Sequence, residues 1–517
     1  MEKFLYERLQ NKTPKINTWF AFPAIESFAM SSLGFLSIFK QIDLMKDVFV
    51  ERVYADTKTT IASVDELDAI GFSNSFEIDI LTILKMLKKW QIPPLSKDRG
   101  EEYPLIYAGG PVLTANPIPY EDFYDFINIG DAKSVFKNVF KILADKKDET
   151  KEAKLKAISE IEAVWVPKFG KDKIIKKMTD EIEEPVYTPI LSDKSYFKDT
   201  FIIEIERGCP KTCNFCLASW LNLPVRYAPL DKILNAIDIG LQNTDKIALL
   251  GAYVAGHPDF DKILNYIREK NKISPVELTL SSLRADLADE NVIRTLVECG
   301  QKSATIAVEA GSERLRKVIN KDLTDEQIAK TVENARLYGL KGLKIYAMIG
   351  LPTETTDDIE ALVNLMKRLK AANKGFELTL SVSTFIPKAH TPFQWSKKAD
   401  SKELNVKLTY LKNKISKMGI NLRPTSIDWD TVQSILARAG FSLSSYLLKV
   451  TENGGNLGAF KQTWRQMAKA GILPDMELYA QNPVPENPDS ELPWGFIDVK
   501  TAPQLKRRLI ESGALNS

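Results

Sequence analysis

Six apolar runs, each of strand length, recur between residues 201 and 397 at intervals of about 25 to 45 residues. A helical pattern of apolar residues follows each of the first five runs. This spacing is typical of βα units, and six such units predict a partial (βα)6 barrel, shorter than the eight-unit form. The runs are Phe201–Ile205, Lys246–Leu250, Val276–Leu280, Ala304–Val308, Leu343–Met348 and Leu378–Val382.

The region before residue 145 alternates the same two patterns. Ile78–Lys89 repeats apolar residues at intervals of three and four, as an amphipathic helix does. Strands that alternate with helices predict an α/β domain with a doubly wound parallel sheet. The predicted strands of this domain are Thr18–Ala24, Phe49–Tyr54, Ala69–Ser73, Leu105–Ala108 and Phe126–Ile129.

Two further regions complete the chain. Residues 146–200 are rich in Lys, Glu and Asp, which predicts a charged helical linker with a solvated helix near Glu149–Val164. Residues 398–517 begin with an amphipathic helical pattern, and we expect a mostly helical C-terminal region. The predicted organisation is therefore an α/β domain at 1–145, the linker, a barrel core at 201–397 and the helical region.

The composition excludes several classes of protein. Seventy basic and 68 acidic residues give a net charge of +2, so no overall basic field favours nucleic acid. RNA stays open as a substrate, because local basic patches such as Lys171–Lys177 exist. The 4 cysteines exclude a disulfide-stapled secreted domain, and the 2 histidines leave little material for a Ser-His-Asp triad.

The N-terminal sequence predicts no membrane insertion. The first residues are charged and carry no signal peptide pattern. The apolar stretch Thr18–Phe39 is interrupted by Pro23 and Glu26, which predicts burial in a core rather than a membrane helix. We expect a protein of the reducing cytoplasm.

Three of the four cysteines lie within eight residues, directly after the first of the six runs. Cys209, Cys213 and Cys216 have the spacing C-x3-C-x2-C, so one loop can present three thiolates to an iron–sulfur cluster. Simple ferredoxin clusters use four cysteines, so three ligands leave one iron open. A zinc site is one alternative, but it needs four protein ligands. Three unrelated buried cysteines are the other.

This loop resembles the cluster loop of the radical S-adenosylmethionine (SAM) superfamily, and Phe215 matches the aromatic residue that usually precedes the third cysteine. The resemblance implies a [4Fe-4S] cluster on Cys209, Cys213 and Cys216, whose open iron chelates the amino and carboxylate groups of SAM. It implies an electron donor such as a flavodoxin or a ferredoxin. Reductive cleavage of SAM then generates a 5′-deoxyadenosyl radical that acts on an unknown substrate.

Small or polar residues follow the predicted strands, at the edge where βα proteins bind ligands. By the resemblance, Glu309 in the segment Val308–Lys321 contacts the ribose or amino group of SAM, and Gly350 and Leu351 pack against adenine. Arg284 is a candidate partner of the SAM carboxylate, since guanidinium pairs bidentately with carboxylate. The alternative for Glu309 is a carboxylate that forms a salt bridge or faces solvent, and for Arg284 it is a surface arginine. The alternative for Gly350 and Leu351 is an ordinary turn between a strand and a helix.

The loop after the second strand departs from the family pattern. Many members carry Gly-Gly-Glu there for the methionine amine, whereas this chain has Leu-Leu-Gly-Ala-Tyr, in which only Gly251 matches. The amine contact is then expected at Glu309 or Ser281. Cys299 is interpreted as a buried structural cysteine, and methylthio transfer, which uses three additional cysteines, is not expected. A non-catalytic iron–sulfur electron-transfer or sensor protein is the alternative of another class, with Cys299 as its candidate fourth ligand.

The N-terminal region resembles the flavodoxin-like cobalamin-binding domain that precedes many radical SAM cores. Tyr107–Pro111 and Gly130-Asp131 match its late strands and turns. The common domain supplies a histidine to cobalt, but residues 1–256 contain none. Either cobalamin binds without a protein ligand below cobalt, or the domain has lost or repurposed the cobalamin site. We expect the second alternative. A cobalamin-dependent radical SAM methyltransferase is the alternative function.

The whole arrangement resembles an uncharacterised group of cobalamin-domain radical SAM proteins. The shared segments are Phe22–Gly34, Pro387–Trp395 and Leu492–Trp494. Within the second segment, Lys388 and His390 are candidates to contact substrate or SAM, and His390 is a candidate to move a proton. The alternative interpretation is a rigid lid bounded by prolines.

Overall fold

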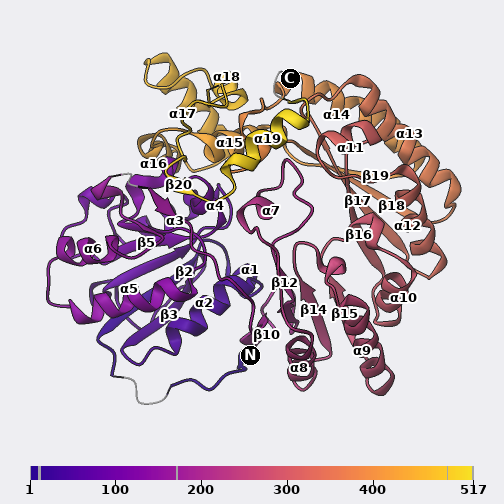
Figure 1. Cartoon of the computed structure of the whole chain (residues 1–517). Coiled ribbons are helices and arrows are strands. Elements are labelled where there is room, and N and C mark those ends of the chain that lie inside the picture. The colour runs from indigo at the N-terminus through magenta and orange to yellow at the C-terminus, as the bar shows by residue number, and fades with distance from the viewer. Residues whose placement is uncertain (1, 10–12, 171–172, 486, 515–517) are drawn as a thin grey trace.

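The computed structural model describes residues 2–9, 13–170, 173–485 and 487–514, so part of the basic patch Lys171–Lys177 lies outside the described residues. Figure 1 shows two α/β halves side by side, with the C-terminal helices lying across one end of both. The predicted α/β class is confirmed, because parallel strands alternate with helices in each half.

A six-stranded sheet forms the N-terminal half, and only its last strand is antiparallel. Alternate residues of its second strand enter two cores: Trp19 and Ala21 pack on one face, and Ile16 and Phe20 on the other. The five predicted strands agree with the observed ones to within two residues. Across the sheet the strands are β3 (Val48–Tyr54), β2 (Ile16–Phe22), β4 (Ala69–Ser73), β5 (Leu105–Gly109), β6 (Phe126–Asn128) and β7 (Val164–Trp165).

Helices cover both faces of this sheet (Figure 1). One face packs against α2 (Leu33–Asp43), α5 (Lys133–Asp145) and α6 (Lys151–Ser159). The other packs against α3 (Asp79–Lys89) and α4 (Pro111–Ala115). A single turn, α1 (Glu26–Ala29), follows β2.

The six predicted strands of the second half are parallel and follow one another in chain order. They form two hydrogen-bonded sheets that meet at an isolated bridge between Leu283 and Ile306. The first sheet holds β11 (Phe201–Glu204), β14 (Lys246–Leu250) and β15 (Glu277–Leu280), and the second holds β16 (Ser303–Glu309), β17 (Gly342–Ile349) and β18 (Glu377–Thr384).

Helices after these strands share one apolar core with them and lie on the outer side of the strands (Figure 1). They are α8 (Leu230–Leu241), α9 (Phe260–Ile273), α10 (Glu290–Glu298), α12 (Asp325–Leu337), α13 (Thr356–Ala372) and α14 (Ser401–Ile415). All six strands therefore end at the same edge, as βα repetition requires.

Residues 146–200, for which the sequence predicts a charged helical linker, contain α6 and four short strands. Besides β7, these are β8 (Ile174–Ile175), β9 (Val186–Tyr187) and β10 (Ile190–Ser192). Each pairs with a different part of the chain: β8 with β20 (Ile497–Asp498), β9 with β11, and β10 with β1 (Glu2–Phe4). The segment is charged, and backbone hydrogen bonds of its short strands connect it to β1, β11 and β20.

The C-terminal region is mostly helical, as predicted, and completes the core of the N-terminal sheet. Its helices are α15 (Ile427–Arg438), α16 (Ser444–Glu452), α17 (Leu457–Lys469), α18 (Met476–Gln481) and α19 (Ala502–Glu511), and β19 (Asn421–Pro424) extends the second parallel sheet. Of the helices described, none is both long and apolar enough to cross a bilayer.

Candidate active site at the carboxyl ends of the parallel strands

The three cysteines lie on one loop beyond the carboxyl end of β11. The chain passes through β12 (Glu206–Arg207), which pairs with β13 (Arg226–Tyr227), then through the loop, and Cys216 caps α7 (Leu217–Leu221). Gly208 has a φ of +92°, and a Cβ there would lie 2.3 Å from the carbonyl oxygen of Asn222. Only glycine fits this turn, which brings the cysteines between the two halves, where α7 lies in Figure 1.

Polar side chains from outside the loop hold its backbone. Asn320, which follows α11 (Glu313–Val318), donates its amide to the carbonyls of Lys211 and Thr212, at 2.9 Å each. The indole of Trp220 donates to the carbonyl of Cys213 at 2.9 Å. The segment after β16 and the cysteine motif are therefore one structural unit.

The thiols suit a cluster better than a single ion. Cys209 and Cys213 are buried, and Cys216 is partly exposed. Burial raises the pKa of Cys213 to about 12, so a thiolate there needs a bound metal to stabilise its charge. Among the described residues, no three His, Cys, Asp or Glu side chains converge on one ion. The cysteines of a cubane cluster bind separate irons and stand farther apart than the ligands of one ion.

The fourth cysteine lies at the opposite end of the strands. Cys299 caps α10, and its carbonyl accepts a hydrogen bond from the N–H of Leu278, near the start of β15. The length of a strand therefore separates it from the cysteine loop. Cys299 is buried among apolar side chains and is not placed to be a fourth ligand.

Two predicted site residues gather beside Cys213. Glu309 has a φ of +71° at a β-bulge and forms an ion pair of 3.2 Å with the buried Lys321. Arg284 binds Asp286 at 2.9 Å and the carbonyl of Lys321 at 2.6 Å, while its Nη1 is buried without a partner in the described chain. The charges of Lys321, Arg284 and Glu309 all act on Cys213. The unpaired Nη1 of Arg284 can donate hydrogen bonds to an anionic ligand.

Glu206, which the sequence analysis did not single out, lies at the base of the same loop. It is 1% exposed; its Oε1 accepts the backbone N–H of Tyr253, and its Oε2 has no partner among the described residues. Burial, with the nearby charge of Glu204, raises the pKa of this carboxyl to about 7. A Cβ on Gly251 would lie 2.4 Å from its Cγ, so the glycine admits the carboxylate. Ser281 donates to the Gly251 carbonyl at 3.1 Å.

The remaining predicted residues lie around an apolar cluster over the strand ends. Leu351 belongs to this cluster, and Phe215 packs against it. Gly350 has a φ of +77°, and a Cβ there would lie 2.7 Å from the side chain of Leu404 in α14. The structure therefore brings Phe215 and Leu351 together, while packing against α14 explains the glycine between strand and helix.

A cavity of about 840 Å³ extends between the carboxyl edges of the two halves. The N-terminal half lines it with Gly109, Gly110 and Asn128, and the other half lines it with Arg207 and Leu250. Gly110 has a φ of +124°, and a side chain there would collide with the backbone of Asn74, so this turn requires glycine. Such an edge is where doubly wound sheets bind ligands, and here it also reaches the start of the cysteine loop.

Ion pairs join the halves beside this cavity. Asp131 lies 3.4 Å from Arg207 and 3.8 Å from Arg226, and it accepts two hydrogen bonds from Thr179 at 2.8 Å. Arg207 also pairs with Glu204 at 2.5 Å. Because Arg207 directly precedes Gly208, the glycine turn of the N-terminal half holds the base of the cysteine loop.

The segment 387–395 is a packed strap. Lys388 forms an ion pair with Glu77 of the N-terminal half, and His390 is buried, with an Nε2 that has no hydrogen-bond partner among the described residues. Burial lowers the pKa of His390 to about 3, so the ring is neutral near pH 7. Its burial at the contact with the N-terminal half favours the rigid lid over proton transfer as the interpretation of this segment.

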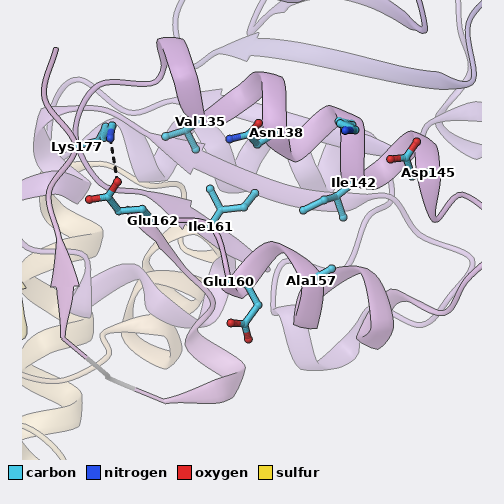
Figure 2. A pocket seen from close by; sticks show the side chains of 10 residues that line it. Val135, Asn138, Ile142, Asp145, Ala157, Glu160, Ile161, Glu162 and Lys177 are labelled. Atoms are coloured by element: carbon cyan, nitrogen blue, oxygen red, sulfur yellow. Dashed lines mark hydrogen bonds and ion pairs between the residues drawn. The ribbon is translucent and has the colours of Figure 1, made fainter.

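Figure 2 shows a second cavity, of about 560 Å³, between α5 and α6. Ile142 and Ile161 line it, and the ion pair of 2.9 Å between Lys177 and Glu162 lies at one end. None of the predicted site residues lines this cavity. None of them lines the larger cavity either, but that cavity lies at the carboxyl edges of both sheets and reaches Arg207, two residues before Cys209, so it is the candidate ligand site.

Two family models match the chain. Residues 203–366 match the model described as "Radical SAM superfamily", and residues 59–167 match the one described as "Radical SAM proteins, N-terminal". The uncharacterized protein MJ0966 of Methanocaldococcus jannaschii is 31% identical over 393 residues, which cover 74% of this chain and 80% of that protein.

Other similar proteins have named activities. The tRNA-2-methylthio-N(6)-dimethylallyladenosine synthase of Nitrosomonas europaea is 27% identical over 255 residues, covering 46% of this chain and 54% of that protein. This chain thus spans about half the length of that relative. OxsB, a cobalamin-dependent S-adenosylmethionine radical enzyme solved with aqua-cobalamin and S-adenosylmethionine bound, matches with a TM-score of 0.52 and 14% identity, over 97% of this chain and 80% of that chain. At this identity the match shows a shared fold.

Proposed function

Because this chain belongs to the radical SAM superfamily, we propose that Cys209, Cys213 and Cys216 hold its [4Fe-4S] cluster and that residues at the neighbouring strand ends hold SAM. As a member of this superfamily, the protein is an enzyme that uses a [4Fe-4S] cluster and SAM. The observation that carries the assignment is the loop itself: it presents three cysteines at the ligand-binding edge, and Cys299 lies at the far end of the strands. One iron is then left open to bind SAM.

When bound, the cluster supplies the electron that cleaves SAM to methionine and a 5′-deoxyadenosyl radical. The chain's own residues bind and orient. Arg284 offers its unpartnered Nη1 to the SAM carboxylate, and Glu309, paired with Lys321, faces the ribose. Phe215 and Leu351 supply the apolar surface for adenine.

The substrate is proposed to enter the cavity between the halves, since that cavity reaches Arg207 at the start of the cysteine loop. Its 840 Å³ volume is that of a site for a small molecule or one end of a larger one, so an RNA substrate would insert a single nucleotide. A flavodoxin or a ferredoxin is the proposed electron donor, and the cytoplasm the proposed compartment.

A cobalamin-dependent radical SAM methyltransferase is the second candidate, because the cavity lies at the glycine-rich edge of the N-terminal sheet. Gly109, Gly110 and Gly130 line the cavity at this edge. No histidine is among the residues lining the cavity, so cobalt would have no histidine ligand there. Addition of cobalamin to the purified protein tests this candidate: retention of its absorbance through gel filtration supports it, and complete loss excludes it.

The primary test is anaerobic. The reconstituted protein is mixed with SAM and dithionite, and 5′-deoxyadenosine is measured by mass spectrometry. We expect it from the wild type and from Cys299→Ala, and a loss of more than about 100-fold from Cys213→Ala, which removes a cluster ligand. A wild-type protein with four irons and four sulfides that neither binds nor cleaves SAM would contradict the proposal.

A further inference from the structure

The cavity between the two halves carries an uneven set of charges. The acids that line it are Asp131, Asp180, Glu181, Glu183, Glu184 and Glu204, and the bases are Lys133, Lys177 and Arg207. Two of the three bases already have partners, because Arg207 pairs with Glu204 at 2.5 Å and Lys177 with Glu162 at 2.9 Å. Little positive charge is therefore left in this cavity to bind an anion.

Three of the acids form one run at the rim. Asp180, Glu181 and Glu183 are exposed, and none of them forms an ion pair within the described part of the chain. The next acid along, Glu184, pairs with Lys232 at 2.6 Å. Among the lining bases that the structure describes, Lys133 is the one without an ion pair. The unpaired charge at the rim is therefore negative on balance, and such a rim attracts cations.

A second and independent observation comes from two amide side chains that line the same cavity. Asn128, at the end of β6, is 1% exposed, and its Nδ2 donates to the carbonyl of Gly130 at 2.9 Å, which fixes the orientation of the amide. Its Oδ1 is buried and has no partner among the described residues, and the same holds for the Oε1 of Gln41 on α2. A buried acceptor without a donor is costly, so both oxygens call for an N–H or O–H group of a ligand.

We infer that the substrate is a small organic amine of net positive charge, an inference that rests on the proposed function, which brings the substrate into this cavity. Its N–H groups donate to the open oxygens of Asn128 and Gln41, and the acidic rim balances its charge. An ammonium group is a donor without an acceptor, so it satisfies both requirements at once.

The rest of the lining suits the carbon skeleton of such a compound. Phe20, Leu33 and Phe72 of the N-terminal half and Leu250 of the other half give the cavity apolar walls. A phosphate-bearing ligand is less suitable, because its oxygens would face unpaired carboxylates and amide oxygens instead of the free cations that phosphate binding needs. A nucleotide is therefore the contrasting class of ligand.

The test compares a cationic and an anionic probe on the cluster-reconstituted full chain. Spermidine and AMP are titrated in turn into the wild type by anaerobic calorimetry, and we expect spermidine to bind at least about 10-fold more tightly. A rim variant, Asp180→Asn/Glu181→Gln/Glu183→Gln, should weaken spermidine binding by about 10-fold or more, because it removes three negative charges. Its control neutralises three exposed acids outside the cavity and should match the wild type: Glu7→Gln/Asp47→Asn/Glu452→Gln.

The amide oxygens separate a bound amine from an amine held loosely at the surface. Asn128→Leu removes the buried acceptor without changing the charge, so we expect spermidine to bind about 10-fold more weakly, as for the loss of a hydrogen bond to a charged group. Gln41→Leu, on the partly exposed side of α2, should act in the same direction and serves if Asn128→Leu does not fold.

Each other outcome overturns the inference. AMP binding as tight as that of spermidine, or no spermidine binding at about 10 mM, would mean that the cavity does not select amines. An effect of the rim variant with no effect of either amide variant would mean surface attraction only. The 5′-deoxyadenosine assay separates this inference from the proposed function: a protein that binds spermidine as expected but cleaves no SAM keeps its amine site and loses the proposed function, whereas one that cleaves SAM and prefers AMP loses only the inference.

Discussion

The two strand edges that face the central cavity are built from different residues. The edge of the N-terminal sheet ends in glycines, of which Gly110 and Gly130 have positive φ angles and backbone atoms within 2.2 Å of an added Cβ. The edge of the second half carries the cysteine loop, Arg284 and Glu206. The first edge consists of tight glycine turns, and the second supplies charged side chains and thiols. Parallel strands thus create a ligand edge in both halves, and the groups proposed to bind the cluster and SAM lie on one of them.

The largest expected effect separates these edges by one substitution in each. Gly208→Ala and Gly110→Ala both force alanine into a positive φ against a backbone carbonyl, with contacts of 2.3 and 2.1 Å. We expect Gly208→Ala to lose most of the bound iron, because it displaces the cysteine loop. Gly110→Ala should keep its iron and lose affinity for whatever occupies the cavity. Iron content after reconstitution is the measurement. Equal iron loss in both variants would show that the two edges do not differ in their effect on the cluster.

Stability should depend strongly on a buried cation at the chemical edge. Arg316 is fully buried; it pairs with Asp325 and donates to the carbonyls of Ala310 and Leu323 at 3.0 and 2.6 Å. Arg316→Met leaves these buried carbonyls without their donor, while Asp325 keeps its pair with Arg368, so we expect a loss of about 3–5 kcal/mol in the free energy of unfolding.

Urea unfolding followed by tryptophan fluorescence measures this loss. The matched control is Arg294→Met, which breaks an exposed pair with Glu290 of 3.4 Å and should cost less than about 1 kcal/mol. A cost for Arg316→Met no larger than that of the control would show that the turn after β16 does not need its buried cation.

The sequence analysis did not predict polar groups whose surroundings come from residues far away in the chain. The strands of both halves were predictable because their apolar runs are local patterns, and Cys209, Cys213 and Cys216 because their spacing is local too. Glu206 was missed because its burial depends on a glycine 45 residues later, Gly251. An acidic residue directly before the loop, after a strand, was the available signal.

His390 shows the same limit in reverse, because an isolated histidine suggests proton transfer, whereas its buried surroundings favour a structural role. It packs where the strap meets Ala115 of the N-terminal half, and its folded pKa of about 3 lies below the unfolded value of about 6.5. The unfolded chain therefore binds the proton more tightly, so stability is full above pH 6.5 and falls as the pH drops toward 3.

From pH 7 to pH 5 this linkage removes about 2 kcal/mol. In His390→Asn, a side chain tolerated at the positive φ of this position, the fall over the same interval should be smaller by that amount. Urea midpoints at the two pH values measure it. An unchanged pH dependence would mean that the ring is solvated and that the two halves are less tightly joined than the structure shows.

The smallest predicted effect concerns the hydrogen bonds that Asn320, in the segment after β16, donates to the cysteine loop. Asn320→Ala removes the hydrogen bonds to the carbonyls of Lys211 and Thr212, so the free energy of unfolding should fall by about 1–2 kcal/mol. Since those carbonyls belong to the cysteine loop, the loosened loop should also lose its cluster to air a few times faster, measured as bleaching of the cluster absorbance. Asn243→Ala, at the end of α8, breaks a bond of similar kind to the carbonyl of Ile239 at 2.7 Å and should leave the bleaching rate unchanged. If both variants bleach alike, the segment after β16 supports the fold in general and not the cysteine loop.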